Sequence, residues 1–336
     1  MNKNLNYTLI ETTVRNTIKK IKDDPERSVR NLVDLALSFS QSRFQQRFFK
    51  SAQTMLKNQN SSYYKLIPDI VANVDTERIV SFGMNVGYNS CTVGAKQIRE
   101  IEAAERFNIP WCIALELNGN DYRKNPSVYH SLISQGKELG IYSWVIHTLG
   151  HPSYIMELIN RFPDCAFVLL CASDEITHAF LDEAENINNV MFALEYDDFA
   201  EDACSLLRSR SFLYSVYSET KITNEHMLDE LLCDTENLHA AFTFLLSSSE
   251  SDTESASIHQ LILQKRTEQN HRTVPFDLLL DTHMIDSIIS ERAGLICFDR
   301  NGACYSLNSH TLYEDYNFMH DTLRDILKKI TQIETP

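Results

Sequence analysis

The chain has 336 residues and a formal net charge of −15, because 31 Lys and Arg stand against 46 Asp and Glu. A surface this acidic repels phosphate backbones and anionic lipids, so we expect neither nucleic acid nor a membrane as a partner. The residue usage, 43% hydrophobic and 23% charged, is typical of a globular protein. The first residues lack the apolar core of a secretory signal, and no run of 18 apolar residues occurs, so we expect a cytoplasmic protein.

The cysteines are scattered along the chain. Eight are present, and no two of them form a C-x2-C pair. In a reducing cytoplasm such cysteines are most simply small buried hydrophobic residues. They are Cys91, Cys112, Cys165, Cys171, Cys204, Cys233, Cys297 and Cys304.

The first part of the chain has a helical pattern. Asp24, Pro25 and Glu26 form a helix start, with an N-cap, a proline at the first helical position and an acid in the first turn. Apolar residues recur at helical spacing after Val29. We therefore expect residues 1–75 to be helical.

From residue 109 onward short apolar runs alternate with amphipathic stretches, which predicts α/β architecture with parallel strands. The runs are continuous, as in strands buried on both faces. The predicted strands are Trp111–Leu117, Tyr142–His147, Ala166–Cys171, Val190–Glu195, Phe212–Tyr217, Ala241–Leu246 and Phe276–Leu280. Two of the predicted helices between them are Val128–Leu139 and His178–Ala184.

The last third of the chain contains three further signals. Ser247–Ser257 is polar and acidic, which predicts a loop. Asn301-Gly302 separates two strand-like runs, Leu295–Phe298 and Ala303–Leu307, which predicts a β-hairpin. A final amphipathic helix is expected from about Met319 to Ile330.

Six segments follow one another in an order that resembles a known family. They are Glu102–Leu117, Val128–Pro152, Ala166–Asp174, Val190–Asp198, Phe212–Thr220 and Gly294–Leu307. In order and spacing they resemble the radical S-adenosylmethionine (SAM) enzymes with a SPASM-like tail, over about residues 93–330. The first segment looks like the family's helix, "IPP" motif and first barrel strand, the second like its second strand and GGEP motif, and the last like its tail hairpin.

The resemblance implies a partial (β/α) TIM-like barrel with an N-terminal helical region and a C-terminal β-hairpin plus helix. The implied domains are a helical region at 1–92, a radical SAM-like barrel at 93–285 and a degenerate SPASM-like tail at 286–336. Active sites of such barrels lie at the C-terminal ends of the strands, called the barrel mouth below.

The sequence departs from the family where the family binds its cofactors. Members hold a [4Fe–4S] cluster through C-x3-C-x2-C after the first strand, whereas Asn118–Pro126 contains no cysteine. The GGEP motif, whose glutamate would meet the amino group of SAM, reads Leu149-Gly150-His151-Pro152. In the tail the family's last two cysteines fall near Glu291 and Leu307. We therefore expect no [4Fe–4S] cluster, and the loss of the glutamate speaks against a SAM cofactor.

Carboxylates and histidines at the barrel mouth are the candidate binding residues. The ligand-binding candidates are Glu116, His147, Gly150, His151, Glu195, Asp197 and Glu219. An alternative is a metal site of His147, His151, Asp281 and His283, since imidazole and carboxylate suit Zn or Fe. No compact motif such as H-E-x-x-H supports this alternative.

The resemblance and its departures predict a pseudoenzyme of the radical SAM type that has kept a scaffold and lost its redox chemistry. The expected role is that of a binding or regulatory partner of an unidentified protein or peptide, such as a radical SAM enzyme or its peptide substrate. Two alternatives stay open: a metal-assisted or acid–base hydrolase or lyase acting at the barrel mouth, and a radical SAM enzyme with atypical ligands.

Overall fold

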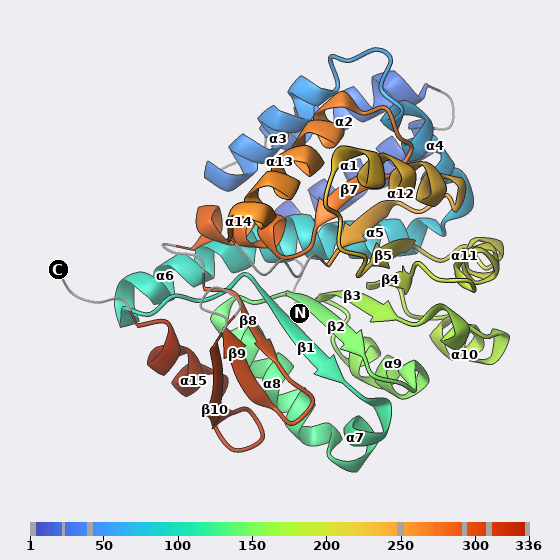
Figure 1. The fold of residues 1–336 in the computed structure, drawn as a ribbon. Coiled ribbons are helices and arrows are strands. Elements are labelled where there is room, and N and C mark those ends of the chain that lie inside the picture. Colours follow the sequence, from blue (N-terminus) through green and yellow to red (C-terminus); the bar gives the residue numbers. More distant parts are fainter. Residues whose placement is uncertain are drawn as a thin grey trace. The chain divides into compact units, whose positions relative to one another are not determined.

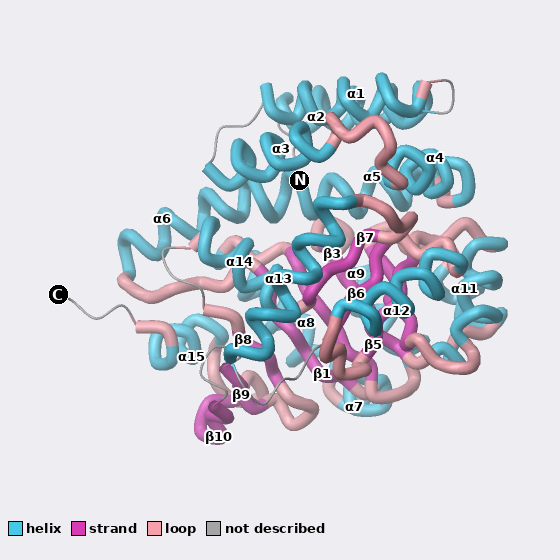
Figure 2. The backbone as a smooth tube through the Cα atoms, turned by 45° about the horizontal axis from the view of Figure 1, so that its top comes forward, coloured by secondary structure: helices cyan, strands magenta, loops and turns pink. Residues whose placement is uncertain are grey.

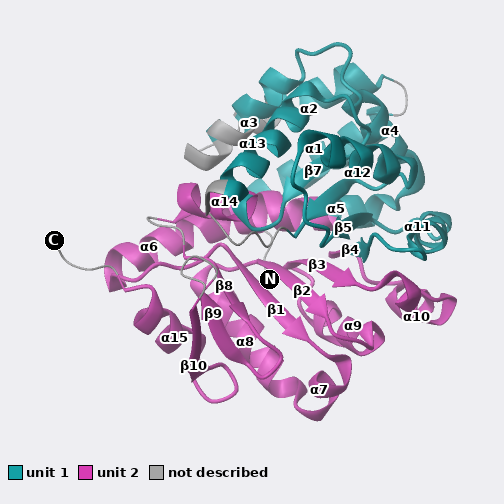
Figure 3. Cartoon of the chain, in the orientation of Figure 1, with its two compact units in different colours: residues 1–80, 192–280 teal, residues 81–191, 281–336 magenta. Residues whose placement is uncertain are grey.

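The computed structural model describes residues 5–21, 24–38, 43–246, 252–290, 294–306 and 311–332. The chain divides into two compact units, each assembled from two separate stretches (Figure 3). Unit 1 contains residues 1–80 and 192–280, and unit 2 contains residues 81–191 and 281–336. The sequence predicts three consecutive domains. The two compact units do not test this prediction, because each unit combines two separate stretches of the chain.

Unit 1 begins with helices, as the sequence predicts. Helices α1 to α3 pack in succession (Figure 2), and α2 begins at Pro25, where Asp24 Oδ1 accepts the N–H of Arg27 at 3.2 Å. The first helices are α1 (Leu5–Ile21), α2 (Pro25–Ser38), α3 (Arg43–Met55), α4 (Tyr63–Asn73) and α5 (Thr76–Met84), the last of which continues into unit 2.

The second stretch of unit 1 alternates strands and helices. Its elements are β4 (Val190–Glu195), which starts in unit 2, α11 (Ala200–Ser209), β5 (Tyr214–Ser218), α12 (Glu225–Asn237), β6 (Phe242–Leu245), α13 (Asp252–Glu268) and β7 (Val274–Asp277). The strands β4, β5, β6 and β7 pair side by side in that order, all parallel.

Two predictions in this stretch are wrong. The polar segment Ser247–Ser257 is helical from Asp252 onward, because Ile258 and Ile262 of α13 enter a buried cluster with leucines of α12. Residues 247–251 lie outside the described residues. The last predicted strand, Phe276–Leu280, ends early. The Asp277 carboxylate accepts the N–H groups of Leu279 and Leu280 at 3.1 and 2.8 Å, which starts a helix there.

Unit 2 contains most of the predicted α/β alternation. Its elements are a π-helix η1 (Asn85–Gly94), α6 (Ala95–Glu105), β1 (Cys112–Leu117), α7 (Gly119–Lys124), α8 (Pro126–Leu139), β2 (Ser143–Thr148), α9 (Pro152–Arg161), β3 (Ala166–Cys171), a 3-10 turn η2 (Ser173–Glu175), α10 (His178–Ala184), α14 (Leu280–Ile289, its first residue in unit 1), β8 (Ile296–Phe298), β9 (Ala303–Ser306), β10 (Thr311–Asn317) and α15 (Leu323–Ile330).

The strands of unit 2 form one row, in the order β10, β9, β8, β1, β2, β3. Strands β8, β1, β2 and β3 are parallel, and β9 and β10 are antiparallel additions. One face of β1 and β2 is fully buried on the side of α8 (Figure 1), where Gly136 of α8 lies against the ring of Trp144. The opposite face carries the half-buried residues that form the candidate site.

The predicted α/β class is confirmed, with ten mostly parallel strands in the described residues. The predicted TIM-like barrel is not confirmed, because the strands do not close into a barrel. In unit 2 β10 is an edge strand, and in unit 1 β7 is an edge strand. The predicted tail hairpin is present as β8 and β9, with Gly302 at φ 85° in its turn. Among the described residues no helix is both long and apolar enough to cross a membrane.

A buried carboxylate in α14 joins the starts of two neighbouring strands of unit 2. Asp286 accepts the N–H of Trp111, just before β1, at 2.9 Å and that of Gly294, just before β8, at 2.7 Å. Burial, and to a lesser extent the nearby Glu102, raises the pKa of Asp286 to about 7, although the two N–H groups lower it. Below about pH 7 the folded chain therefore holds a proton on this carboxyl group that the unfolded chain releases near the ordinary pKa of the group.

This raised pKa predicts a pH dependence of stability that Asp286→Asn removes. A group with a raised pKa stabilises the fold fully below its unfolded pKa and loses that contribution as the pH rises through its folded pKa. We expect the stability of Asp286→Asn relative to the parent to improve by about 2 kcal/mol between pH 5 and pH 8. Urea unfolding at both pH values measures this difference, and an equal difference at both would contradict it.

Candidate functional site

The candidate site lies on the half-buried face of the unit 2 strands. Glu116 at the end of β1 is the register partner of His147 on β2, so the two side chains lie side by side on one face. Both are half-buried, whereas the neighbouring Leu115 and Leu117 point to the opposite, fully buried face. The structure thus brings together two of the residues that the sequence assigns to the barrel mouth.

Two residues that the sequence analysis missed share this face. Cys297 on β8 pairs with Ala114 of β1, and Tyr305 on β9 pairs with Cys297. The alternation of the predicted strand Leu295–Phe298 could have placed Cys297 opposite Ile296 and Phe298. No sequence signal could have placed it beside β1, because that pairing joins strands far apart in the chain.

The thiols of the chain are protonated at neutral pH. Burial, with a smaller contribution from the nearby Glu116, raises the pKa of Cys297 to about 12. Burial likewise raises the pKa of all seven other cysteines, for example Cys91 and Cys304 to about 12. Because the thiolate is the nucleophile and the metal ligand, these raised pKa values make the thiols poor nucleophiles and poor metal ligands at neutral pH.

The loops after β1 and β2 are tied together by hydrogen bonds that we call the strand-end contact. Leu149 N–H donates to the Leu117 carbonyl at 3.0 Å, and Gly119 N–H donates to the Gly150 carbonyl at 2.9 Å. The Asn118 side-chain amide donates to the Leu149 carbonyl. A Cβ atom at position 119 would overlap the carbonyl oxygen of His151, so the two loops touch directly.

The segment after β1 is a short helix, α7, which starts within this contact. The Asn118 side chain caps it by accepting the N–H of Asn120 at 3.0 Å. Tyr122 in its middle is buried, with its hydroxyl 3.0 Å from Nε2 of His130. The segment where the resemblance places the cluster cysteines is therefore a capped helix with a buried tyrosine.

The loop after β2 presents its side chains to the exterior. Gly150 and His151 both have positive φ, 112° and 58°, and the His151 N–H donates to Glu175 Oε1 at 2.9 Å. The imidazole of His151 is exposed and stacks on the ring of Tyr154, with centroids 5.9 Å apart. Burial raises the pKa of Glu175, and the hydrogen bond from His151 lowers it in part.

The remaining ligand-binding candidates belong to unit 1. Glu195 is half-buried at the end of β4, where it pairs in register with Tyr217. Asp197 is exposed and accepts the N–H of Phe199 at 2.9 Å, in the turn before α11. Glu219 is exposed after β5. In the described part of unit 1 these three carboxylates do not form a group that could hold a metal ion.

The alternative metal set does not form at a strand end. Asp281 and His283 lie on α14, beyond the end of β7 at Asp277, and Asp281 is buried. Burial lowers the pKa of His283. In the part of the chain that the structure describes, no three His, Cys, Asp or Glu side chains are grouped so that they could hold a metal ion.

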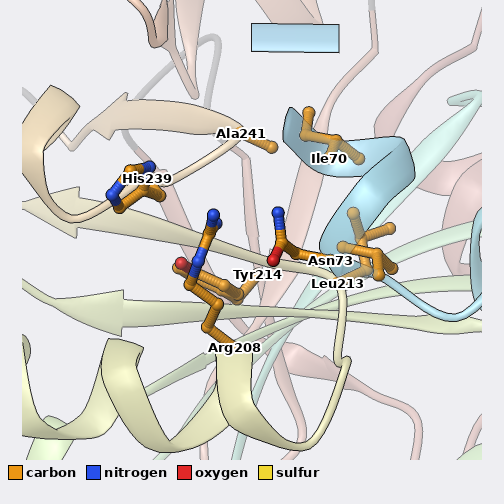
Figure 4. Close-up of a pocket in the computed structure, with 8 residues that line it drawn as sticks. Ile70, Asn73, Arg208, Leu213, Tyr214, His239 and Ala241 are labelled. Atoms are coloured by element: carbon orange, nitrogen blue, oxygen red, sulfur yellow. The ribbon is translucent and has the colours of Figure 1, made fainter. Parts of the chain in front are cut away.

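Unit 1 contains a small enclosed cavity between α4, α11 and the segment before β6 (Figure 4). Beside it Arg208 forms a bidentate ion pair with Asp69 at 2.7 and 2.9 Å, and His239 Nδ1 lies 3.2 Å from the same carboxylate. The Arg208 guanidinium lowers the pKa of Asp69. The cavity volume of about 10 Å³ has room for roughly one water molecule and not for a larger ligand. The contacts of Asp69 with Arg208 and His239 therefore serve to hold α4, α11 and the segment before β6 together.

Comparison with known protein families finds no match, and no curated protein matches the chain. Among solved structures, Streptococcus suis SuiB bound to S-adenosylmethionine is similar at 10% identity and a TM-score of 0.47, covering 74% of this chain and 70% of that one. A second SuiB structure gives 9% identity and 0.47, covering 96% and 82%. A protein from Aquifex aeolicus VF5 gives 9% and 0.33, covering 58% and 95%. These TM-scores all lie below 0.5.

The strand-end contact predicts that Gly119 tolerates no side chain. We expect Gly119→Ala to lower the free energy of unfolding by about 2 kcal/mol, because the methyl group forces the two loops apart. Gly83→Ala is the matched control, since a Cβ there meets nothing within 4 Å. Urea denaturation measures both variants. If Gly119→Ala is as stable as the parent, the two loops are not held in contact.

Proposed function

We propose that the chain is a cluster-free, radical SAM-like protein without catalytic activity of its own, which acts as a binding or regulatory partner of another protein or peptide. The observation that carries the proposal is the structure of the segment after β1. There the resemblance calls for three cluster cysteines, and the chain has the capped helix α7, closed against the loop after β2.

The donor groups of this segment do not fit an iron–sulfur cluster. Residues 118–126 offer amide, carboxylate and phenol groups, whereas iron in such clusters is bound by thiolates. All eight cysteines lie in the described residues, and they do not gather into a set of three.

The residues at the GGEP-like position also differ from what SAM binding would need. Position 151 carries an exposed imidazole stacked on Tyr154, where the family has a carboxylate for the amino group of SAM. The carboxylate of Glu175, beside this position, accepts the backbone N–H of His151. These contacts favour a role in binding over a role in catalysis.

Anaerobic incubation with ferrous iron and sulfide tests the absence of a cluster. After desalting we expect a colourless protein without stoichiometric iron and without iron–sulfur absorbance bands, because apart from the exposed Cys233 the thiols are buried or half-buried, and burial raises their pKa. Cys233→Ser is the matched control, since Cys233 is the exposed cysteine and could hold iron adventitiously. Stoichiometric iron with these bands in Cys233→Ser would overturn the proposal.

The partner role is tested by tagging the chain in its native host and identifying what purifies with it. A protein or peptide recovered in a fixed ratio supports the proposal. If purification under mild conditions repeatedly returns the chain alone, the partner role is abandoned.

A further inference from the structure

We propose that the turn between β4 and α11 in unit 1 forms a docking surface for an arginine-bearing peptide segment of a partner. This inference rests on the proposed function, because it names the chemistry of the partner. The docking surface consists of Tyr196–Phe199, the two exposed acids in the first turn of α11, and Glu219 after β5.

Two exposed aromatic rings lie three residues apart in this turn. Phe199 is 57% exposed and Tyr196 is 36% exposed, which is high for large hydrophobic side chains. In the part of the chain that the structure describes, neither a cation nor a second aromatic ring covers either of them. Both rings are therefore available to a partner.

Hydrogen bonds hold this turn in one geometry. Tyr196 N–H donates to the Tyr217 carbonyl of β5 at 2.8 Å. The Asp197 carboxylate accepts the Phe199 N–H at 2.9 Å, and the Tyr196 hydroxyl donates to Asp234 of α12 at 3.2 Å. The rings are thus carried on an ordered turn before any partner binds, which reduces the entropic cost of association.

The charges around the two rings are of one sign. Residues 195–207 contain five carboxylates and no lysine or arginine. The exposed carboxylates that make no ion pair within the described residues are those of Asp198, Glu201, Asp202 and Glu219. The last of these follows β5, the strand that pairs with β4 and on which α11 packs (Figure 1).

The next cations along the chain do not offset these carboxylates. Lys221, after β5, and Glu254 lie 3.4 Å apart and neutralise each other. Arg208 and Arg210 lie at the opposite end of α11, where Arg208 is bound to Asp69. The positive end of the α11 dipole amounts to about half a charge, against two acids in its first turn. Electrostatic complementarity therefore favours a cationic partner.

Arginine is the cation that suits this combination of groups. Its planar guanidinium stacks on aromatic rings and donates two parallel hydrogen bonds to a carboxylate. A metal ion does not suit it, because no three of these carboxylates are grouped to hold one among the described residues. The carboxylates are spread over the turn, α11 and the segment after β5, so a peptide with several arginines can reach more of them than a small cation can.

Fluorescence anisotropy with a labelled decapeptide of alternating Arg and Ser tests this inference on the full-length chain. We expect saturable binding that weakens as salt is added, weakens when Lys replaces Arg in the probe, and is lost when Glu replaces Arg. Asp198→Lys should weaken binding about tenfold, since repulsion replaces attraction, and Asp198→Asn should give an intermediate affinity.

The aromatic part of the docking surface has its own variant. Phe199→Ser should weaken binding of the Arg probe roughly threefold and reduce the preference for Arg over Lys, because it removes a ring on which a guanidinium stacks. We expect this variant to fold, since Phe199 is exposed and serine is a favourable N-cap at the start of α11.

Glu26→Lys is the matched control for Asp198→Lys, because it makes the same charge change at an exposed position of α2 in the same unit. We expect it to leave the affinity within about twofold of the parent. Thermal unfolding of each variant checks that the fold is intact.

Three results would overturn the inference: equal binding of the Arg and Glu probes, equal effects of Asp198→Lys and Glu26→Lys, or a preference for Arg over Lys that Phe199→Ser leaves unchanged. Full competition by magnesium ion at constant ionic strength would mean a site for bare cations. Self-association that Asp198→Lys abolishes, seen by sedimentation, would assign the surface to a second copy. Both of these results would also overturn it.

Failure of this inference is distinguishable from failure of the proposed function. A protein or peptide that purifies in the same fixed ratio with the parent and with Asp198→Lys would support the partner role and contradict this docking surface. The iron reconstitution involves neither Asp198 nor Phe199, so its outcome is independent of both variants.

Discussion

The strand-end contact determines what the unit 2 strands can do at their C-terminal ends. Backbone hydrogen bonds from residues 117–119 to residues 149–150 bring the first two loops against each other. Buried polar backbone groups must be paired, so opening these loops for a ligand would leave them without partners. The same contact starts α7 and fixes the positive-φ turn that exposes Leu149 and His151. The same hydrogen bonds thus close the strand ends and leave the side chains of Leu149 and His151 exposed.

The sequence predicts the strands of this fold well because they are buried on both faces. Ala166–Cys171 and Val190–Glu195 match β3 and β4, since a continuous apolar run bounded by polar residues leaves little ambiguity. The tail hairpin follows from Asn301-Gly302, whose turn preference is local. The segment from Asp252 is different. Its polar and acidic start resembles a loop, and only the tertiary burial of Ile258 and Ile262 makes it helical.

The site was only partly predictable for a related reason. Glu116 and His147 end neighbouring parallel strands, so their proximity follows from chain order alone. Cys297 reaches the same face by pairing with Ala114 of β1, a strand far away in the sequence, and Tyr305 follows it through the local β8–β9 hairpin. The register between β8 and β1 is not encoded locally. Arg123 and Tyr154 meet because α7 packs on α9, which neither helix reveals by itself.

Helical periodicity explains which side chains of α7 are buried and which face solvent. A cluster-binding loop must turn three side chains toward a common inner point. In this segment the side chain that points inward is Tyr122, which is buried, hydrogen-bonded to His130 and packed against Tyr129. Removing that side chain from its pocket would cost several kcal/mol of burial. The residues that follow Tyr122 on the helix, Arg123 and Lys124, are therefore held outward. The same packing that buries Tyr122 keeps these two cations at the surface, so no side chain of α7 is left to close around an inner ligand.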